Sequence, residues 1–357
     1  MTNYLKQRLA RFDAALEASG VDAVLVTNLT NIYYLTGFHG TNATILISDK
    51  RRLFVTDARY IAMAREVVQG FDIIDHRDAL GEIAKAIAGD GLETIGFEND
   101  VTFGFYQQLA RVFEGYQLEP LANFVEQLRL IKDASEIATI KQACSISDKA
   151  FLDVLDFIKP GKTTELEVAT FLDFRMREYG ASGISFDTIA ASGYRSAMPH
   201  GRASDKLILA GESLTLDFGC YYNHYVSDMT RTIHVGHVTD EEREIYDIVL
   251  RANQALIEKA RAGLTFTDVD GIPRKVIEEA GYGPYFTHGI GHGIGLDVHE
   301  EPFFRKTDEV LEAGMVITDE PGIYLEGKYG LRIEDDLLIT ETGCEILTHA
   351  PKELIVI

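Results

Sequence analysis

The chain has 357 residues, of which 46% are hydrophobic and 25% are charged, and its formal net charge is −22. This length is sufficient for two domains with separate cores, and the composition is ordinary for a soluble globular protein. The acidic balance excludes nucleic acid as an expected partner, because such binding requires Lys and Arg to neutralise phosphates, and no apolar run approaches the ~20 residues of a membrane span.

The first 120 or so residues alternate between patterns typical of helices and of strands. Apolar residues at helical spacing predict a helix over residues 5–19, ended by Gly20. Two apolar runs predict a hairpin over residues 44–48 and 52–56. The remaining predicted elements are strands at 22–26, 71–74 and 94–97 and helices at 58–68, 79–88 and 103–113. This order indicates a compact α/β domain.

A long helical pattern then begins near Asp133, with Asp133 or Ser135 as N-cap, and runs to about residue 158. Further helices are predicted at 164–179, 241–262 and 267–280, followed by a strand-rich C-terminal third. The boundary between the two parts should lie between residues 124 and 131. We therefore expect an N-terminal domain over residues 1–125 and a second domain over residues 126–357.

The cysteines are few and widely separated, and the N-terminal segment has no apolar signal core. Cys144, Cys220 and Cys344 form no CxxC motif, so a disulfide framework is not expected. A reducing, cytoplasmic location fits this pattern.

Two segments of the second domain each resemble a pair of strands carrying two carboxylates. In the first segment, alternation of side chains sets Asp217 on one face of a strand, and Asp228 on a face of the return strand with Thr230. A hairpin can bring these two aspartates side by side.

In the second segment, Glu320 lies in the string TDEPG and Glu334 in the string LRIEDD. The flanking apolar residues predict buried strands, and unpaired buried carboxylates are very costly. Taken alone, Glu334 could pair with Arg332, and Glu320 with the Pro-Gly that follows it is also a turn signature.

Between these segments lies the glycine-rich string HGIGHGIGLDVH, which holds His288, His292 and His299. Its alternate glycines allow the backbone to approach a ligand closely. A single histidine in such a loop is more often structural, and a phosphate loop is discounted because no GK[ST] follows. The conjunction of four acids on strands with an imidazole among them indicates a metal site.

These strings resemble the pita-bread metallopeptidases, which include methionine aminopeptidase, aminopeptidase P, prolidase and the non-metal enzyme creatinase. The matching strings are LDFG, SDMTRT, HGIGHGIGLDVHEEP, TDEPGIY and RIEDD, in family order and spacing, and NIYYLTGF resembles the accessory domain of the Xaa-Pro branch. The resemblance implies an α/β (α+β) fold with a creatinase-like N-terminal α/β domain followed by a pita-bread catalytic domain. His224 departs from the pattern, since a small residue, often glycine, is expected there.

The resemblance implies that five residues bind two divalent metal ions. Mn²⁺ is expected first, with Co²⁺ or Zn²⁺ as alternatives, because oxygen-rich ligation with one imidazole suits such ions. A hydroxide held between the metals would be the nucleophile. The implied ligands are Asp217, Asp228, His292, Glu320 and Glu334.

The family positions also imply roles around the metals. His299 and His200 match positions that contact substrate or stabilise the tetrahedral intermediate. Glu320 would also shuttle a proton to the leaving group. His288 is expected to line the substrate pocket, and Tyr324 to hydrogen-bond near the metals. Arg332 is expected to orient Glu334 beside the substrate.

The predicted function is therefore an Xaa-Pro aminopeptidase of the aminopeptidase P type, acting on peptides with proline in second position, in a chain expected to be a homodimer. The alternative is an Xaa-Pro dipeptidase (prolidase), which accepts only dipeptides. Methionine aminopeptidases lack the N-terminal domain. A catalytically dead binding protein or a creatinase-type amidinohydrolase should have lost metal ligands, which this chain retains.

Overall fold

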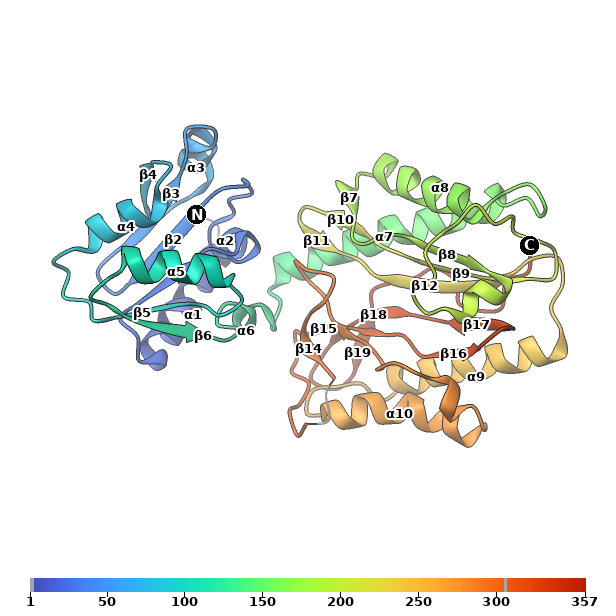
Figure 1. Cartoon of the computed structure of the whole chain (residues 1–357). Helices are drawn as coiled ribbons and strands as arrows, with labels where there is room; N and C mark the ends of the chain where they lie inside the picture. The colour runs from blue at the N-terminus through green and yellow to red at the C-terminus, as the bar shows by residue number, and fades with distance from the viewer. Residues whose placement is uncertain (1–2, 305–306) are drawn as a thin grey trace. The chain divides into compact units, whose positions relative to one another are not determined.

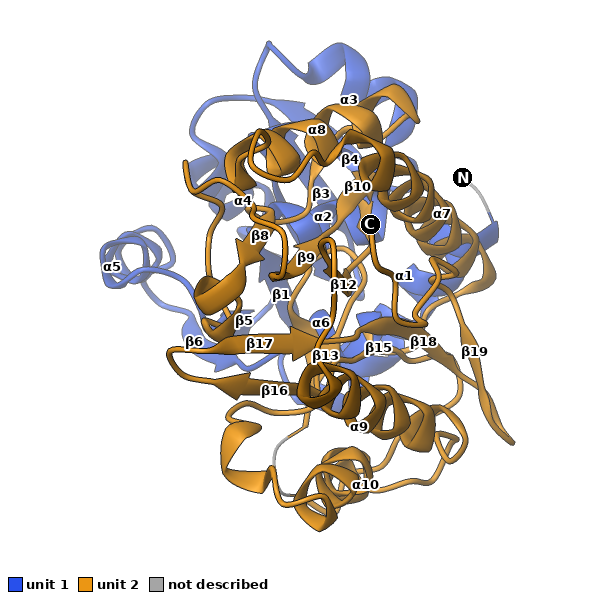
Figure 2. Ribbon diagram, turned by 90° about the vertical axis from the view of Figure 1, so that its right-hand side faces the viewer, with its two compact units in different colours: residues 1–129 blue, residues 130–357 orange. Residues whose placement is uncertain are grey.

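The computed structural model describes residues 3–304 and 307–357. The chain divides into two compact units, Met1–Arg129 and Leu130–Ile357 (Figure 2). The division falls after α6 (Glu126–Arg129), a few residues beyond the boundary expected at residue 125. This short helix belongs with the first unit because Glu126 and Arg129 both hydrogen-bond to Asn31. Among the described residues, no helix is both long and apolar enough to cross a membrane.

The first unit is built on one mixed sheet with strand order β4-β3-β2-β1-β5-β6 (Figure 1). β1 runs antiparallel to β2 and parallel to β5, which places the predicted hairpin of β2 and β3 beside the centre of the sheet. The strands are β1 (Ala23–Val26), β2 (Thr44–Ser48), β3 (Arg52–Thr56), β4 (Asp72–Asp75), β5 (Thr94–Glu98) and β6 (Gln117–Leu121). The other helices are α1 (Asn3–Ser19), α2 (Leu29–Thr36), α3 (Ile61–Val67), α4 (Ala79–Ile87) and α5 (Phe103–Val112).

Helices of the second unit begin where the sequence provides reciprocal caps. The side chain of Asp133 accepts hydrogen bonds at the start of α7 (Ala134–Phe157), while Glu136 binds back to the Asp133 amide. Equivalent boxes start α8 (Glu165–Glu178) and α9 (Asp240–Ile257), and a threonine cap starts α10 (Phe266–Glu279). These caps explain why the helix starts were predictable from sequence.

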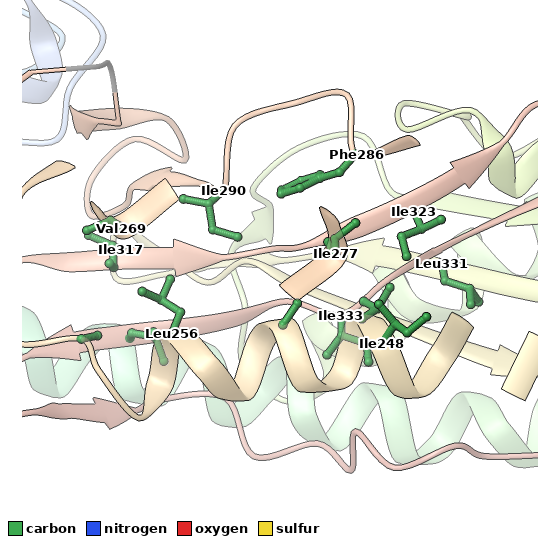
Figure 3. Packing of buried hydrophobic residues seen from close by; sticks show 14 of the residues in the cluster. Ile248, Leu256, Val269, Ile277, Phe286, Ile290, Ile317, Ile323, Leu331 and Ile333 are labelled. Atoms are coloured by element: carbon green, nitrogen blue, oxygen red, sulfur yellow. The ribbon is translucent and has the colours of Figure 1, made fainter. Parts of the chain in front are cut away.

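The strands of the second unit lie between the helix pair α7 and α8 and the helix pair α9 and α10 (Figure 1). One core joins α7 and α8 to the sheet β12-β9-β8. The other joins α9 and α10 to the sheet β14-β13-β15-β18-β19 and the ribbon β16-β17; Figure 3 shows Ile248 and Leu256 of α9 near Ile317 and Ile333 of the strand region. The predicted α/β class, with an α/β unit followed by a unit of helices and antiparallel strands, is confirmed.

The strands of the second unit that matter for the site have the following bounds: β7 (Gly183–Ile184), β8 (Ile189–Ser192), β9 (Ser213–Phe218), β10 (Cys220–Tyr222), β11 (Tyr225–Val226), β12 (Met229–His234), β13 (His292–Gly293), β14 (Glu300–Phe303), β15 (Val316–Asp319), β16 (Gly322–Leu325), β17 (Tyr329–Arg332), β18 (Asp335–Ile339) and β19 (Cys344–Ile346). The turn between β10 and β11 places Asn223 at φ 45° and His224 at φ 72°. Both lie in the left-handed region, which accounts for the small residue expected at position 224.

Candidate metal centre

The five predicted ligands come from strand ends in the middle of the second unit. Asp217 lies in β9, and Asp228 directly precedes β12. His292 opens β13, Glu320 directly follows β15, and Glu334 occupies the junction between β17 and β18. The structure therefore draws the five donors from two sheets and the ribbon, all packed between the helix pairs.

Four of the five predicted ligands gather around the imidazole of His292. Asp228, His292 and Glu334 each offer a ligand atom, and these atoms lie within 4.8 Å of one another. His292 Nε2 is 3.8 Å from Asp228 Oδ2 and 3.7 Å from Glu320 Oε1. Asp217 completes the cluster, since its charge acts on the carboxyls of Asp228, Glu320 and Glu334.

The strand register places Asp217 and Asp228 near each other, in a diagonal arrangement. Asp217 faces Thr230 across the β9–β12 pair, and Asp228 lies diagonally, one residue before β12. The two aspartates are therefore not cross-strand partners. At Gly219, directly after β9, the chain passes so close to Ser227 that a Cβ would lie 1.9 Å from the Ser227 carbonyl oxygen. Only glycine permits this crossing.

The electrostatics of the cluster fit bound cations. Burial raises the pKa of Asp228 and Glu320 well above their usual range, and the negative charge of Glu334 raises it further. Burial, followed by the charge of Asp217, raises the pKa of Glu334. Asp228 Oδ1 is buried without a hydrogen-bond partner among the described residues. Four carboxylates held this way need compensating positive charge, and the oxygen-rich donor set suits hard or borderline divalent ions.

The imidazole of His292 is prepared to act as a ligand. Burial, with the neighbouring His299, lowers the pKa of His292 to about 4, so its ring is neutral at pH 7. His292 Nδ1 lies 3.1 Å from the Gly293 carbonyl oxygen, which fixes the proton on Nδ1 and leaves the Nε2 lone pair facing the carboxylates. The backbone N–H of His292 donates to Thr318 Oγ1 at 3.0 Å.

Arg332 does not pair with Glu334 as the sequence suggested. Its Nη2 donates to Asp217 Oδ2 at 2.6 Å, and its Nε donates to Thr230 Oγ1 at 3.0 Å. Thr230 in turn donates to Glu334 Oε2 at 2.7 Å. Because β17 ends at Arg332 and the chain changes sheets before β18, the alternation assumed for a single strand breaks between these residues. Arg332 therefore acts on Glu334 through the Thr230 hydroxyl and through its charge, which opposes the rise in the pKa of Glu334.

The remaining predicted residues surround this cluster. Arg332 Nη1 donates to the Tyr324 hydroxyl at 2.7 Å, and His288 Nε2 lies 2.8 Å from the same oxygen. The ring of His299 lies 4.3 Å, centroid to centroid, from that of His292. His200 is exposed in the loop after the short 3₁₀ helix Gly193–Ala197, yet its charge lowers the pKa of both His288 and His299. All ten predicted positions thus meet in one region.

The sequence did not predict the residues that hydrogen-bond to the backbone beside the candidate ligands. Asp336 Oδ2 accepts from the backbone N–H of Asp228 at 3.1 Å and from the thiol of Cys144 at 3.3 Å. Asp335 pairs with Arg231 at 2.8 Å. The run of three acids at 334–336 could have indicated these residues. Adjacent acids beside a buried apolar strand all require hydrogen-bond or ion-pair partners.

Two family models together match most of the chain. The sequence model of metallopeptidase family M24 matches residues 138–341, and that of the creatinase/prolidase N-terminal domain matches residues 8–131. The chain is 40% identical over 354 residues to the Xaa-Pro dipeptidase of Pyrococcus horikoshii, covering 98% of this chain and 99% of that protein.

Two solved structures are similar along almost the whole chain. The Xaa-Pro dipeptidase from Bacillus anthracis is 44% identical with a TM-score of 0.96, covering 99% of this chain and 100% of that one. The X-Pro aminopeptidase from Thermotoga maritima is 40% identical with a TM-score of 0.89, covering 98% of this chain and 99% of that one.

Proposed function

The chain belongs to metallopeptidase family M24 and is therefore a hydrolase, and on that premise we propose that it is an Xaa-Pro dipeptidase. The observation that carries the choice is similarity along nearly the full chain to Xaa-Pro dipeptidases at 40% and 44% identity. The aminopeptidase P activity expected from the sequence is not confirmed, and these relatives support the dipeptidase alternative instead. The Thermotoga maritima relative keeps an X-Pro aminopeptidase as the second candidate.

Asp217, Asp228, His292, Glu320 and Glu334 are proposed to hold two divalent cations. When bound, such cations supply Lewis acidity that polarises a carbonyl and lowers the pKa of water. Manganese as the physiological ion, a homodimeric state and a cytoplasmic location stay predictions.

Other residues of the chain have proposed roles toward the substrate. His299 lies beside His292 and is proposed to donate a hydrogen bond to the scissile carbonyl oxygen as negative charge develops. His200 is proposed to contact the substrate from the exposed loop. Glu320 is proposed to carry a proton to the leaving proline nitrogen. The hydrogen-bonded group of Arg332, Tyr324 and His288 is proposed to form the wall of the substrate pocket.

Proline in second position follows from the chemistry of its amide. The peptide nitrogen of proline carries no N–H, so a pocket shaped for the ring need not supply a buried acceptor. A substrate with alanine there brings an N–H that goes unpaired, at a cost of about 1–3 kcal/mol. That cost corresponds to roughly tenfold to hundredfold discrimination before ring packing is counted.

Substrate length decides between the two candidate functions. In the presence of Mn²⁺, we expect Ala-Pro to be cleaved with a kcat/KM at least about tenfold higher than Ala-Pro-Ala or Ala-Pro amide. A dipeptidase must recognise the free carboxylate of proline, and a hydrogen bond to a charged group contributes about 1.5–3 kcal/mol. Steady-state kinetics on the three substrates measure this ratio.

Each other outcome has a definite meaning. Equal or faster cleavage of Ala-Pro-Ala would assign the chain to the X-Pro aminopeptidases. Slow cleavage of Ala-Pro-Ala with fast cleavage of the amide would show a length limit without carboxylate recognition. Release of methionine from Met-Ala peptides with no preference for proline would overturn the proposed substrate class.

A further inference from the structure

A single carboxylate lies at the base of the loop that joins two histidines of the site. Glu300 opens β14, directly after His299, and its register partner across the sheet is Gly293, directly after His292. The loop of residues 294–299 therefore leaves and rejoins the sheet at Gly293 and Glu300.

The Glu300 carboxylate fills the interior of the loop. Its Oε2 accepts hydrogen bonds from the backbone N–H groups of Leu296 at 3.2 Å and Asp297 at 3.3 Å. Gly295 passes so close that a Cβ there would lie 2.4 Å from Glu300 Oε1. The loop backbone is thus wrapped around the carboxylate, and its shape depends on that group staying in place.

Lys132 supplies the opposite charge. Its Nζ lies 2.9 Å from Glu300 Oε1, and the two side chains are only 1% and 6% exposed. Lys132 precedes α7, and its backbone N–H donates to the Gly314 carbonyl at 2.9 Å, which fixes the residue to the body of the second unit. The ion pair therefore connects a fixed backbone segment to the histidine loop.

The buried position makes this pair sensitive to the loss of either partner. A buried carboxylate that loses its cation must either move toward solvent, which takes it away from the Leu296 and Asp297 amides, or take up a proton, which weakens the hydrogen bonds that it accepts from them. The ring of His299, the last residue of this loop, lies 4.3 Å from that of His292. A displaced loop would therefore move His299 relative to the candidate metal ligands.

We infer that Lys132 is a positioning residue for His299, acting through the Glu300 carboxylate that shapes the 294–299 loop. This inference rests on the proposed function, in which His292 is a metal ligand and His299 contacts the substrate. Lys132 itself is buried against Glu300 and has no proposed contact with the substrate.

The experiment compares Lys132→Met with a matched core variant, Val154→Ala. Val154 is fully buried in the core shared by α7 and α8, so its truncation lowers stability without touching the site. In metal-free protein labelled at histidine, the imidazole NMR signals of His292 and His299, assigned from single histidine variants, are expected to shift in Lys132→Met and not in Val154→Ala. In Mn²⁺-loaded enzyme, kcat for Ala-Pro is expected to fall about tenfold to hundredfold in Lys132→Met with little change in KM.

Two further variants keep the test decisive. Lys132→Gln keeps a polar side chain beside Glu300 and replaces Lys132→Met if that protein does not fold. The double variant Lys132→Met/Glu300→Gln removes both charges but keeps an acceptor for the loop amides, so it is expected to recover most of the lost kcat. A double variant as impaired as Lys132→Met would overturn the charge-pair basis of the inference.

Unchanged histidine signals and unchanged kcat in the lysine variants, with a loss of melting temperature like that of Val154→Ala, would overturn the inference and leave Lys132 a structural residue. This result differs from a failure of the proposed function, which would appear as inactivity of the wild-type enzyme on Ala-Pro. The NMR comparison needs neither metal nor substrate.

Discussion

Replacing Glu334 by alanine is expected to lower kcat/KM for Ala-Pro by at least about a thousandfold. Glu334 lies 2% exposed at the junction of β17 and β18, within the group of donors formed with Asp228 and His292. A bound cation supplies several kcal/mol of transition-state stabilisation, and each 1.36 kcal/mol is a factor of ten in rate. Steady-state kinetics measure the loss, and elemental analysis of the same sample should show reduced metal content.

The stability of the metal-free protein gives an independent measurement for this variant. Truncation of a buried carboxylate in a cluster of like charges relieves repulsion, so the melting temperature of the metal-free form should not fall as it does for most core truncations. The increase in melting temperature on adding Mn²⁺ should be strongly reduced, because a ligand that binds only the folded state stabilises it more the tighter it binds.

Glu326 is an exposed acid between β16 and β17, and Glu326→Ala is the matched control. Wild-type metal content in Glu334→Ala would show that Glu334 is not a ligand.

His299→Ala is expected to lose about a hundredfold or more in kcat while retaining wild-type metal content. Removal of one donor to a developing oxyanion costs on the order of 10²–10³ in kcat. His299 is exposed to solvent, yet desolvation beside the His292 ring lowers its pKa below the usual histidine value. It is therefore neutral at pH 7, with a ring N–H to donate. Kinetics and elemental analysis on one sample separate loss of chemistry from loss of metal.

Alanine variants of two other histidines serve as comparisons for His299→Ala. His237→Ala, in an exposed loop after β12, should behave as wild type. His200→Ala should show a similar or milder loss than His299→Ala, because His200 is exposed and can contact the substrate only from its loop. If His299→Ala strips metal, its role as a hydrogen-bond donor is misassigned. If His200→Ala changes nothing, His200 is an ordinary surface residue.

Most helices and strands could be predicted from short sequence patterns. The helix after Asp133 could be placed within a residue because its cap and the Glu136 that completes the box are encoded within one turn. The helix Leu29–Thr36 was missed because its β-branched and aromatic residues are typical of strands, and its start depends on the Asn28 side chain accepting from Thr30 and Asn31. The edge strand Gln117–Leu121 was missed because Pro120 is unfavourable inside a sheet.

The identity of the candidate ligands was visible in sequence, whereas their support was not. Strand alternation near Asp217 predicted the face of the carboxylate but not its partner Thr230, because alternation within one strand does not set the register between two strands. The pairing of Arg332 with Asp217, and of Lys132 with Glu300, joins residues far apart in the chain. No periodicity over a short window reports such contacts, which are set by how the sheets pack.

The scattering of the donors over β9, β12, β13, β15 and the β17–β18 junction has a consequence for the lifetime of the folded state. Cations held by these five residues would cross-link segments that only long-range sheet formation brings together, so the site cannot exist until that chain closure is nearly complete. Interactions that form after the folding transition state slow unfolding without accelerating refolding. Bound metal would therefore mainly lower the unfolding rate of the second unit. The N-terminal unit contributes none of the five ligands, so its unfolding rate would not be lowered in this way.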